Sequence, residues 1–437
     1  MSSQAFNRQL LDFIGASPTP FHAVKNLRAA LDAAGFVALV EEDQWQLQAG
    51  GRYYMTRNGS SIIAFVVGRK PLAETGIRMV GAHTDSPCLK VKPKPELHRQ
   101  GYFQLGVEVY GGALLNPWFD RDLSIAGRVI VDNGDGQLRQ ALVDLKRPVA
   151  VIPSLAIHLD RDANNERRVN PQTDIPPLLF KDSNKDTRDF RQLLSDELGK
   201  SEPALSGKRV VDYELYFYDT LAPAVTGLNG EFLSSARLDN LLSCFTGLKA
   251  LLEAGDEQSI MLICNDHEEV GSVSACGANG VMLQSLLERL CPQPEQLTRV
   301  IRRSLLISAD NAHGIHPNYT DRHDGNHGPL LNEGPVLKVN ANQRYATNSV
   351  TAAIFRRLCE RAGVPLQVFV NRTDLGCGST IGPITAAMIG VQTLDVGVPT
   401  FAMHSIREMA GGDDAFNLYR VLNEFFNDGS SLVVEDI

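Results

Sequence analysis

Two adjacent glutamates, Glu268 and Glu269, follow the apolar run at 260–264. Such a run predicts a buried strand. Consecutive side chains at the end of a strand point in different directions, so the two carboxylates need not do the same work. One could bind a metal ion while the other transfers protons. The alternative is a solvated surface pair, and residues elsewhere in the chain decide between the two interpretations.

Other apolar runs also lead to residues that bind metals. These residues are His83 after 77–82, Asp310 after 304–309, and His404 a few residues after 392–396. Asp239 stands where a helix over 239–253 is predicted to begin. In open α/β sheets, sites lie outside the carboxyl ends of the strands, so we expect these side chains to converge. Taken singly, a histidine at a strand end can be structural, and an aspartate at a helix start can be an N-cap.

Two histidines and three carboxylates fit a site for two zinc ions per subunit, with one carboxylate bridging them. Two zinc ions bring four positive charges, whereas Asp239, Glu269 and Asp310 bring three negative ones, so the surplus would hold a hydroxide. Zinc lowers the pKa of a bound water to about 7. Glu268 is not needed as a ligand and could take the proton of that water. Asp85, two residues after His83, could accept the N–H of the other ring nitrogen.

A second group of histidines occupies the loop at 311–335. His313, His316, His323 and His327 could form another metal site. We favour the alternative, in which they are hydrogen-bonding residues of an active-site loop.

The order of predicted elements indicates an α/β fold with an insertion. Alternating strands and helices fill 1–90 and 231–437, which we assign to one catalytic domain. Short β-type runs fill 91–230, which we assign to an inserted β-rich domain. Within the insertion, the polar stretch 161–208 predicts a long or partly mobile loop.

Composition excludes several classes of function. The net charge of −9 and the pI of about 5.6 argue against nucleic-acid binding. The chain has no apolar run of membrane-spanning length and no signal-peptide pattern at its start. Its seven cysteines are scattered without a CxxC pair, which indicates reduced thiols and a cytoplasmic location.

Several motifs resemble one known family along nearly the whole chain. They are GAHTDSP at 81–87, SARLDN at 235–240, NDHEEVGS at 265–272, SADNAHGIHPNY at 308–319, KVNANQRYAT at 338–347, CGSTIGP at 377–383 and MHSIRE at 403–408. This set closely resembles the aspartyl aminopeptidase family of dizinc exopeptidases.

The resemblance implies a zinc-exopeptidase catalytic domain, built on a mixed sheet with helices on both faces, and an inserted oligomerisation domain. It implies that His83 and Asp310 hold one zinc ion, that Glu269 and His404 hold the other, and that Asp239 bridges them. It also implies that Glu268 is the general base. Relatives assemble as tetrahedral dodecamers, in which a histidine matching His158 reaches a neighbouring subunit's active site. Lys338 and Tyr345 match residues of the substrate pocket.

The main hypothesis is therefore an aminopeptidase that removes N-terminal residues, preferentially Asp or Glu, from peptides. One alternative is an aminopeptidase that prefers neutral first residues, and another is a carboxypeptidase or deacylase with the same ligands. A non-catalytic metal-binding assembly protein is a further alternative. The presence of Glu268 argues against it, because a protein that only bound metal would need no base there.

Overall fold

The computed structural model describes residues 1–134, 136–182 and 189–434. The chain forms two compact units. The first unit contains Met1–Asp85, Pro223–Met403 and Glu408–Ile437, and the second contains Ser86–Ala222 and His404–Arg407. The first unit is therefore assembled from segments on both sides of a long insertion.

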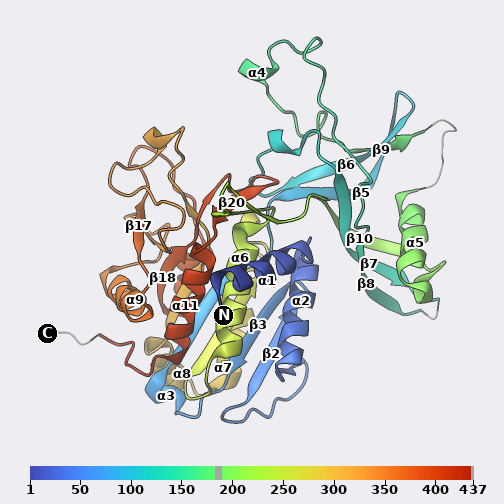
Figure 1. The fold of residues 1–437 in the computed structure, drawn as a ribbon. Helices are drawn as coiled ribbons and strands as arrows, with labels where there is room; N and C mark the ends of the chain where they lie inside the picture. Colours follow the sequence, from blue (N-terminus) through green and yellow to red (C-terminus); the bar gives the residue numbers. More distant parts are fainter. Residues whose placement is uncertain (135, 183–188, 435–437) are drawn as a thin grey trace. The chain divides into compact units, whose positions relative to one another are not determined.

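A nine-stranded mixed sheet forms the centre of the first unit (Figure 1). In spatial order its strands are β1 Val37–Ala38, β2 Arg52–Arg57, β3 Ser61–Val66, β13 Ser259–Asn265, β4 Ile77–His83, β14 Leu305–Ala309, β18 Gln392–Gly397, β16 Val336–Val339 and β17 Gln367–Val370. The central strands β13, β4, β14 and β18 run parallel to one another. Their carboxyl ends therefore meet at one edge of the sheet.

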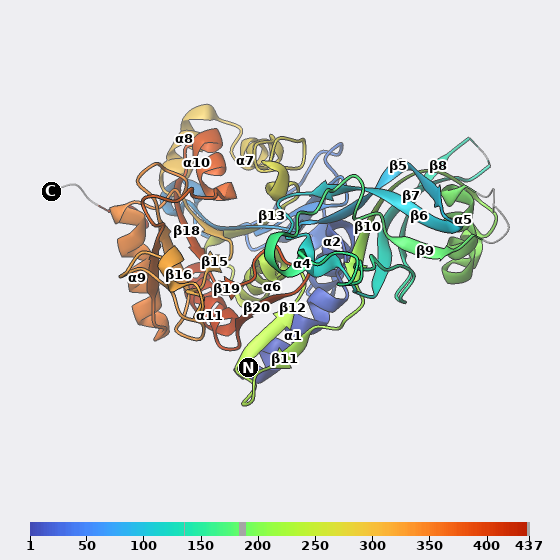
Figure 2. The same ribbon diagram turned by 90° about the horizontal axis from the view of Figure 1, so that it is seen from above.

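Alternating side chains of these strands face two hydrophobic cores. Val80 and Leu262 join the core on one face, whereas Met79 and Met261 join the core on the other. The first core also receives the helices α1 Ser3–Gly15, α2 Pro20–Ala33, α6 Leu238–Glu253, α9 Ser349–Ala362 and α11 Asp414–Asn427. The second receives α3 Leu72–Thr75, α7 Met282–Leu290, α8 Pro294–Arg302 and the end of α10 Ile381–Ile389. Helices thus cover both faces of the sheet, as expected (Figure 2).

A small second sheet in the same unit supports the loop that carries His404. Its five strands are, in spatial order, β11 Ala224–Thr226, β12 Phe232–Ser235, β20 Glu408–Gly411, β19 Pro399–Phe401 and β15 Ala312–His313. The strands β19 and β20 pair antiparallel. His404 lies in the loop between them.

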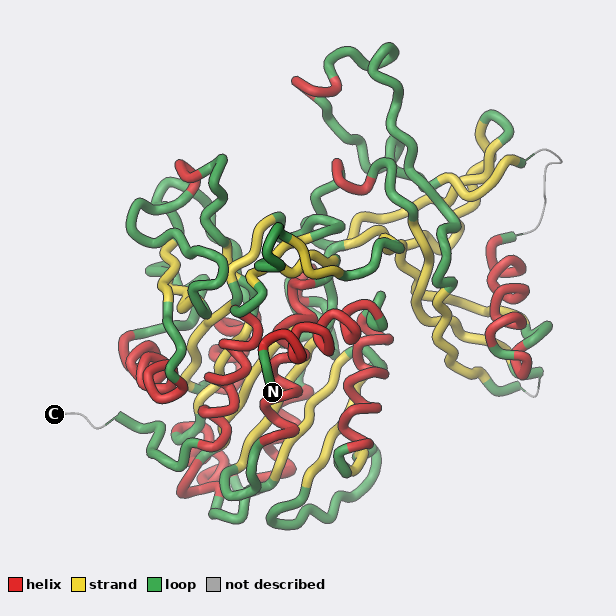
Figure 3. The backbone as a smooth tube through the Cα atoms, viewed as in Figure 1, coloured by secondary structure: helices red, strands yellow, loops and turns green. Residues whose placement is uncertain are grey.

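The second unit is built on a six-stranded antiparallel sheet (Figure 3). Its strands are, in spatial order, β8 Leu138–Asp144, β7 Leu123–Asp132, β10 Arg209–Asp219, β5 Cys88–Arg99, β6 Tyr102–Tyr110 and β9 Leu178–Lys181. Its core contains buried side chains from β5, β6, β7 and β10. The insertion is therefore β-rich, as the sequence predicts.

The prediction of a long loop over 161–208 is wrong in part. This stretch contains β9, the short helix α4 Ala163–Glu166 and the twelve-residue helix α5 Phe190–Ser201. The Asp189 carboxylate caps α5 by accepting the Gln192 N–H at 2.8 Å. The helix buries Phe190, Leu194 and Leu198 in the core of the second unit. Residues 183–188 of the stretch lie outside the described residues.

Among the described residues, no helix combines the length and the apolar character that a membrane crossing requires.

Candidate metal centre

The strands of the large sheet bring the predicted ligands of the first unit together. His83 ends β4 and is in register with Asn265, the last residue of the parallel strand β13. On the other side of β4, the strand β14 ends at Ala309, so Asp310 follows at the same edge. The expected convergence of residues at strand ends is therefore confirmed for His83 and Asp310.

His83, Asp239 and Asp310 surround one point. The Nε2 atom of His83 lies 3.4 Å from Asp239 Oδ1 and 3.5 Å from Asp310 Oδ1. Tetrahedral zinc with ordinary zinc–nitrogen and zinc–oxygen distances separates such ligand atoms by about 3.4 Å. All three side chains are buried. The two distances from His83 thus match those between ligands of a tetrahedral zinc ion, and all three ligand atoms lie within 4.8 Å of one another.

The local backbone explains how Asp239 reaches this point. Asp239 and Asn240 have non-helical backbone angles at the start of α6. The Asp239 N–H donates to Glu408 Oε2 at 3.0 Å, and Asn240 Nδ2 donates to the carbonyl of Ala309 at 2.8 Å. The N-cap position of α6 is occupied by Arg237, two residues before Asp239. The Asp239 carboxylate faces His83.

Asp85 holds the backbone of the Glu268–Glu269 pair. Its Oδ1 accepts the Glu268 N–H at 3.2 Å, and its Oδ2 accepts the Glu269 N–H at 3.1 Å. His83 Nδ1 lies 3.1 Å from the main-chain oxygen of Asp85 and 3.4 Å from Oδ1. Asp85 thus contacts His83 at Nδ1, the ring nitrogen that does not face Asp239, and its carboxylate accepts the main-chain N–H groups of both glutamates.

The site concentrates negative charge in a buried space. Glu268 and Glu269 each offer an atom within 4.8 Å of His83, and Glu269 offers one within 4.8 Å of Asp239. Burial, opposed by the attraction of His83 and reinforced by repulsion from Asp310 and Asp239, raises the pKa of Glu268 to about 8. Burial and the charge of Asp239 raise the pKa of Glu269 well above its usual range. Such carboxylates ionise only with nearby positive charge, and divalent metal ions supply it.

Lys338 and Tyr345 lie beside Asp310. The buried Lys338 Nζ lies 3.0 Å from the carbonyl oxygen of Asn311 and 3.5 Å from Asp310 Oδ2. The same nitrogen lies 5.1 Å from the centre of the Tyr345 ring. The Lys338 ammonium group therefore lies close to the carboxylate of a predicted metal ligand.

The histidine-rich loop does not form a second metal site among the described residues, where no metal-ligand group joins His313, His316, His323 and His327. His316 Nδ1 accepts the Asn318 N–H at 3.1 Å, and His327 Nδ1 lies 2.6 Å from Asp324 Oδ1. These contacts favour the hydrogen-bonding role.

The two remaining predicted residues belong to the second unit. His404 has a left-handed backbone, with φ of 68°, and its Nδ1 lies 3.2 Å from the carbonyl oxygen of Gly112. His158 is exposed in a turn at 156–160.

The sequence indicated no role for Glu408, which accepts a hydrogen bond from the main-chain N–H of Asp239. The MHSIRE motif contained it, but nothing in the motif's spacing indicated its contact with residue 239.

Comparison with known proteins identifies the family of the chain. The model of a family described as "Aminopeptidase I zinc metalloprotease (M18)" matches residues 13–426. The chain belongs to the M18 family. It is thus a zinc metalloprotease with aminopeptidase activity, a hydrolase, and the non-catalytic alternative loses its support.

Relatives match this M18 aminopeptidase over almost their whole length. "Probable M18 family aminopeptidase 2" of Stutzerimonas stutzeri (strain A1501) is 60% identical over 421 residues, which cover 96% of this chain and 98% of that protein. A chain in the cryo-EM structure of the Ape4 and Nbr1 complex is 40% identical with a TM-score of 0.92, and the match covers 97% of this chain and 86% of that one. The S. cerevisiae mApe1 dodecamer is 30% identical with a TM-score of 0.83, and the match covers 96% of both chains.

Proposed function

We propose that this M18 aminopeptidase binds two zinc ions per subunit and cleaves the N-terminal peptide bond with Glu268 as the general base. The observation that carries the proposal is the arrangement of His83, Asp239 and Asp310 at zinc-ligand spacing beside Glu268 and Glu269. Asp239 is the proposed bridge, because one of its atoms also lies within 4.8 Å of an atom of Glu269.

His404 is the proposed partner of Glu269 at the second ion. It directly follows Met403 of the first unit, in the loop between β19 and β20. The first residue of β20, Glu408, accepts the Asp239 N–H at 3.0 Å. The main-chain N–H of Asp239 is thus bound to the residue that follows the MHSIR segment.

Zinc, when bound, polarises the scissile carbonyl group and acidifies water. Glu268 takes the proton from the attacking water and returns it to the leaving amine. Its main-chain N–H donates a hydrogen bond to Asp85, and this bond fixes the position of the backbone from which the Glu268 side chain extends. Burial disfavours the charged form of this carboxylate, which makes it a stronger proton acceptor than an exposed glutamate.

The proposed activity is tested on a panel of aminoacyl reporter substrates. The enzyme is chelated, assayed, reloaded with zinc and assayed again, with N-acetylated substrates in parallel. We expect activity on free amines only, lost on chelation and restored by zinc. Equal cleavage of acetylated substrates would favour the deacylase or carboxypeptidase alternative.

We further propose a preference for Asp or Glu as the first residue, supported by the motifs shared with aspartyl aminopeptidases and by Lys338. A substrate carboxylate could compete with Asp310 and Asn311 for the Lys338 ammonium group. The cavity of about 370 Å³ that Arg344, Arg372 and Cys377 line offers other cations, although Arg372 Nε already contacts Asp374 Oδ1 at 2.7 Å.

Lys338→Met is expected to lower kcat/KM for an Asp substrate about 10- to 100-fold more than for a Leu substrate, because a charge-assisted hydrogen bond contributes about 1.5–3 kcal/mol. The assay compares both substrates in the same zinc-loaded preparation, with Lys70→Met, at an exposed lysine of the same unit, as the matched control. Equal losses on the two substrates would mean that Lys338 supports Asp310 without selecting the substrate.

We also propose that the protein assembles as a tetrahedral dodecamer, in which His158 of the partner subunit completes the active site. A relative forms a dodecamer. In this chain, apolar side chains surround His158 on the surface: Leu155 is 58% exposed, Ile157 47% and Leu159 75%. Exposed apolar residues clustered in one turn are typical of an interface.

Leu159→Asp is expected to break the assembly into smaller species and to lower the activity per subunit. Burying a leucine at an interface contributes about 1.5–3 kcal/mol, and a buried unpaired charge opposes association. Light scattering coupled to size exclusion measures the mass. Leu138→Asp, on β8 at 65% exposure, is the control. Unchanged mass for Leu159→Asp would contradict an interface at this turn.

A further inference from the structure

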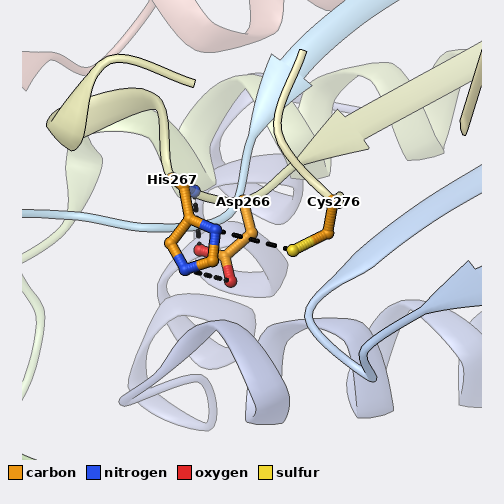
Figure 4. Close-up of side chains that lie close together, drawn as sticks. All are labelled: Asp266, His267 and Cys276. Carbon is orange, nitrogen blue, oxygen red and sulfur yellow. Dashed lines mark hydrogen bonds and ion pairs between the residues drawn. The ribbon is translucent and has the colours of Figure 1, made fainter. Parts of the chain in front are cut away.

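Three more side chains, of types that commonly bind metals, lie close together next to the glutamate pair and outside the proposed ligand set. Asp266, His267 and Cys276 each offer one ligand atom, and these atoms lie within 4.8 Å of one another (Figure 4). Asp266 and His267 follow β13 directly, whereas Cys276 lies further along the same loop.

One ligand atom from each residue lies close enough to the others to share one small cation. His267 Nδ1 lies 3.5 Å from Cys276 Sγ, whereas the other ring nitrogen, Nε2, lies 3.5 Å from Asp266 Oδ2. One ion takes only one of the two nitrogens, so Nδ1 is the candidate ligand beside Cys276 and the Asp266 carboxylate would turn towards the ion. Tetrahedral zinc separates a sulfur and a nitrogen ligand by about 3.6 Å. The imidazole also contacts Ser274, with Nδ1 2.9 Å from its Oγ. Binding through Nδ1 therefore requires the ring to exchange this serine contact for the ion.

The backbone holds the two halves of the cluster together. The Ser61 hydroxyl accepts the Asp266 N–H at 2.8 Å and donates to the Cys276 carbonyl at 2.8 Å. Asn265 Nδ2 also donates to that carbonyl, at 3.3 Å. These contacts hold the backbone on both sides of the cluster. Within the cluster, Asp266 Oδ1 accepts the His267 N–H at 2.8 Å, and Cys276 Sγ lies 3.6 Å from Ser274 Oγ. Asp266 and Cys276 are therefore held near each other by the backbone before a metal ion binds.

The left-handed backbone of His267, with φ of 66°, separates this cluster from the residues that follow. The chain then enters the short helical turn η3 Glu268–Val270. The Asp266 and Cys276 residues are each 4% exposed, whereas 27% of the His267 side chain is exposed. The imidazole side is therefore the route by which an ion and a water ligand would enter.

We propose that Asp266, His267 and Cys276 form a third cation site, for a divalent transition metal of the zinc class. One thiolate, one imidazole and one carboxylate suit such ions, whereas calcium and magnesium prefer oxygen ligands alone. Binding forms a sulfur–metal bond and releases the thiol proton to solvent. The ion ties Cys276 to the two residues before Glu268 and so steadies the loop that carries both glutamates.

Cobalt(II) tests this site separately from the proposed catalytic centre. The ligands proposed for the catalytic centre contain no sulfur, so a thiolate-to-cobalt charge-transfer band reports the third site alone. Titrating the reduced full-length protein with cobalt chloride is expected to produce this band. Cys276→Ser is expected to lose the band and one bound cobalt equivalent. Cys291→Ser, at another buried cysteine, is the matched control and keeps both.

His267→Gln provides a second variant if Cys276→Ser does not fold, and it is expected to weaken cobalt binding at least about 10-fold, measured from the same band. Absence of the band in the folded wild-type protein at saturating cobalt would overturn the proposal, as would an unchanged band in Cys276→Ser. The measurement is the charge-transfer band and not peptidase activity. If the proposed catalytic function were wrong but the third site existed, the protein would show the band and no peptidase activity.

Discussion

The Glu268→Gln enzyme is expected to keep its zinc and to lose about 10²- to 10⁴-fold in kcat. Glutamine has the shape of glutamate but cannot take the proton of the attacking water. The Glu268 N–H stays on Asp85 in this variant, because that bond is made by the main chain, so the side chain keeps its position. Turnover of a reporter substrate is measured together with zinc content.

Glu257→Gln, at an exposed glutamate of the same unit, is the matched control and should behave as wild type. A Glu268→Gln preparation that holds its full zinc and turns over at a near-normal rate would rule out Glu268 as the base.

Asp239→Asn is expected to weaken binding at both zinc positions by at least about 100-fold and to remove most activity at low zinc. The substitution preserves the volume but removes the charge that lies between His83 and Glu269. The main-chain bond from residue 239 to Glu408 remains possible, so the fold of α6 should persist. Zinc affinity is measured by competition with a chromogenic chelator.

The matched control is Asp256→Asn, because Asp256 pairs with Arg69 at 2.8 Å on the surface and contacts no predicted ligand. Zinc binding by Asp239→Asn with the affinity of the wild type would contradict the bridging role.

Lowering the pH is expected to weaken zinc binding at the same site, because protons compete with zinc for His83. Burial favours the neutral imidazole, but the hydrogen bonds to Asp239, Asp310 and Asp85 outweigh it and raise the pKa of His83 well above its usual value. The surrounding carboxylates thus favour the protonated imidazole, and a zinc ion competes with that proton for Nε2. Apparent affinity for the zinc ion that His83 holds is expected to fall as the pH is lowered, because that ion displaces a proton from His83, and competition with a chromogenic chelator at several pH values measures it.

Much of the first unit follows from the pattern of its sequence. The runs at 77–82, 260–264 and 304–309 are mostly apolar, with Arg78, Ser304 and Ser308 as the polar exceptions. Such runs are typical of strands buried on both faces. Those strands form the middle of the large sheet, with cores on both sides. The position of the acidic and imidazole side chains at its edge could therefore be predicted from the points at which the apolar runs end.

Other elements depend on contacts that no local pattern reveals. The helix α5 has only a few buried apolar residues in a polar stretch, so its composition resembles a loop. The pairing of β19 with β15 and of β20 with β12 joins residues far apart along the chain. Likewise, Cys276 meets His267 only because the intervening turn has left-handed residues at His267 and Ser272. Hydrophobic periodicity does not report such turns.

The position of β4 in the sheet has a consequence for synthesis on the ribosome. Both of its neighbours, β13 and β14, follow the entire insertion in the chain. The nascent chain therefore exposes an apolar strand with two open edges while the whole segment at 86–222 emerges behind it. Unpaired strand edges can pair with other chains and cause aggregation. We therefore expect molecular chaperones to bind the nascent chain chiefly at this stage of translation, while both edges of β4 are unpaired.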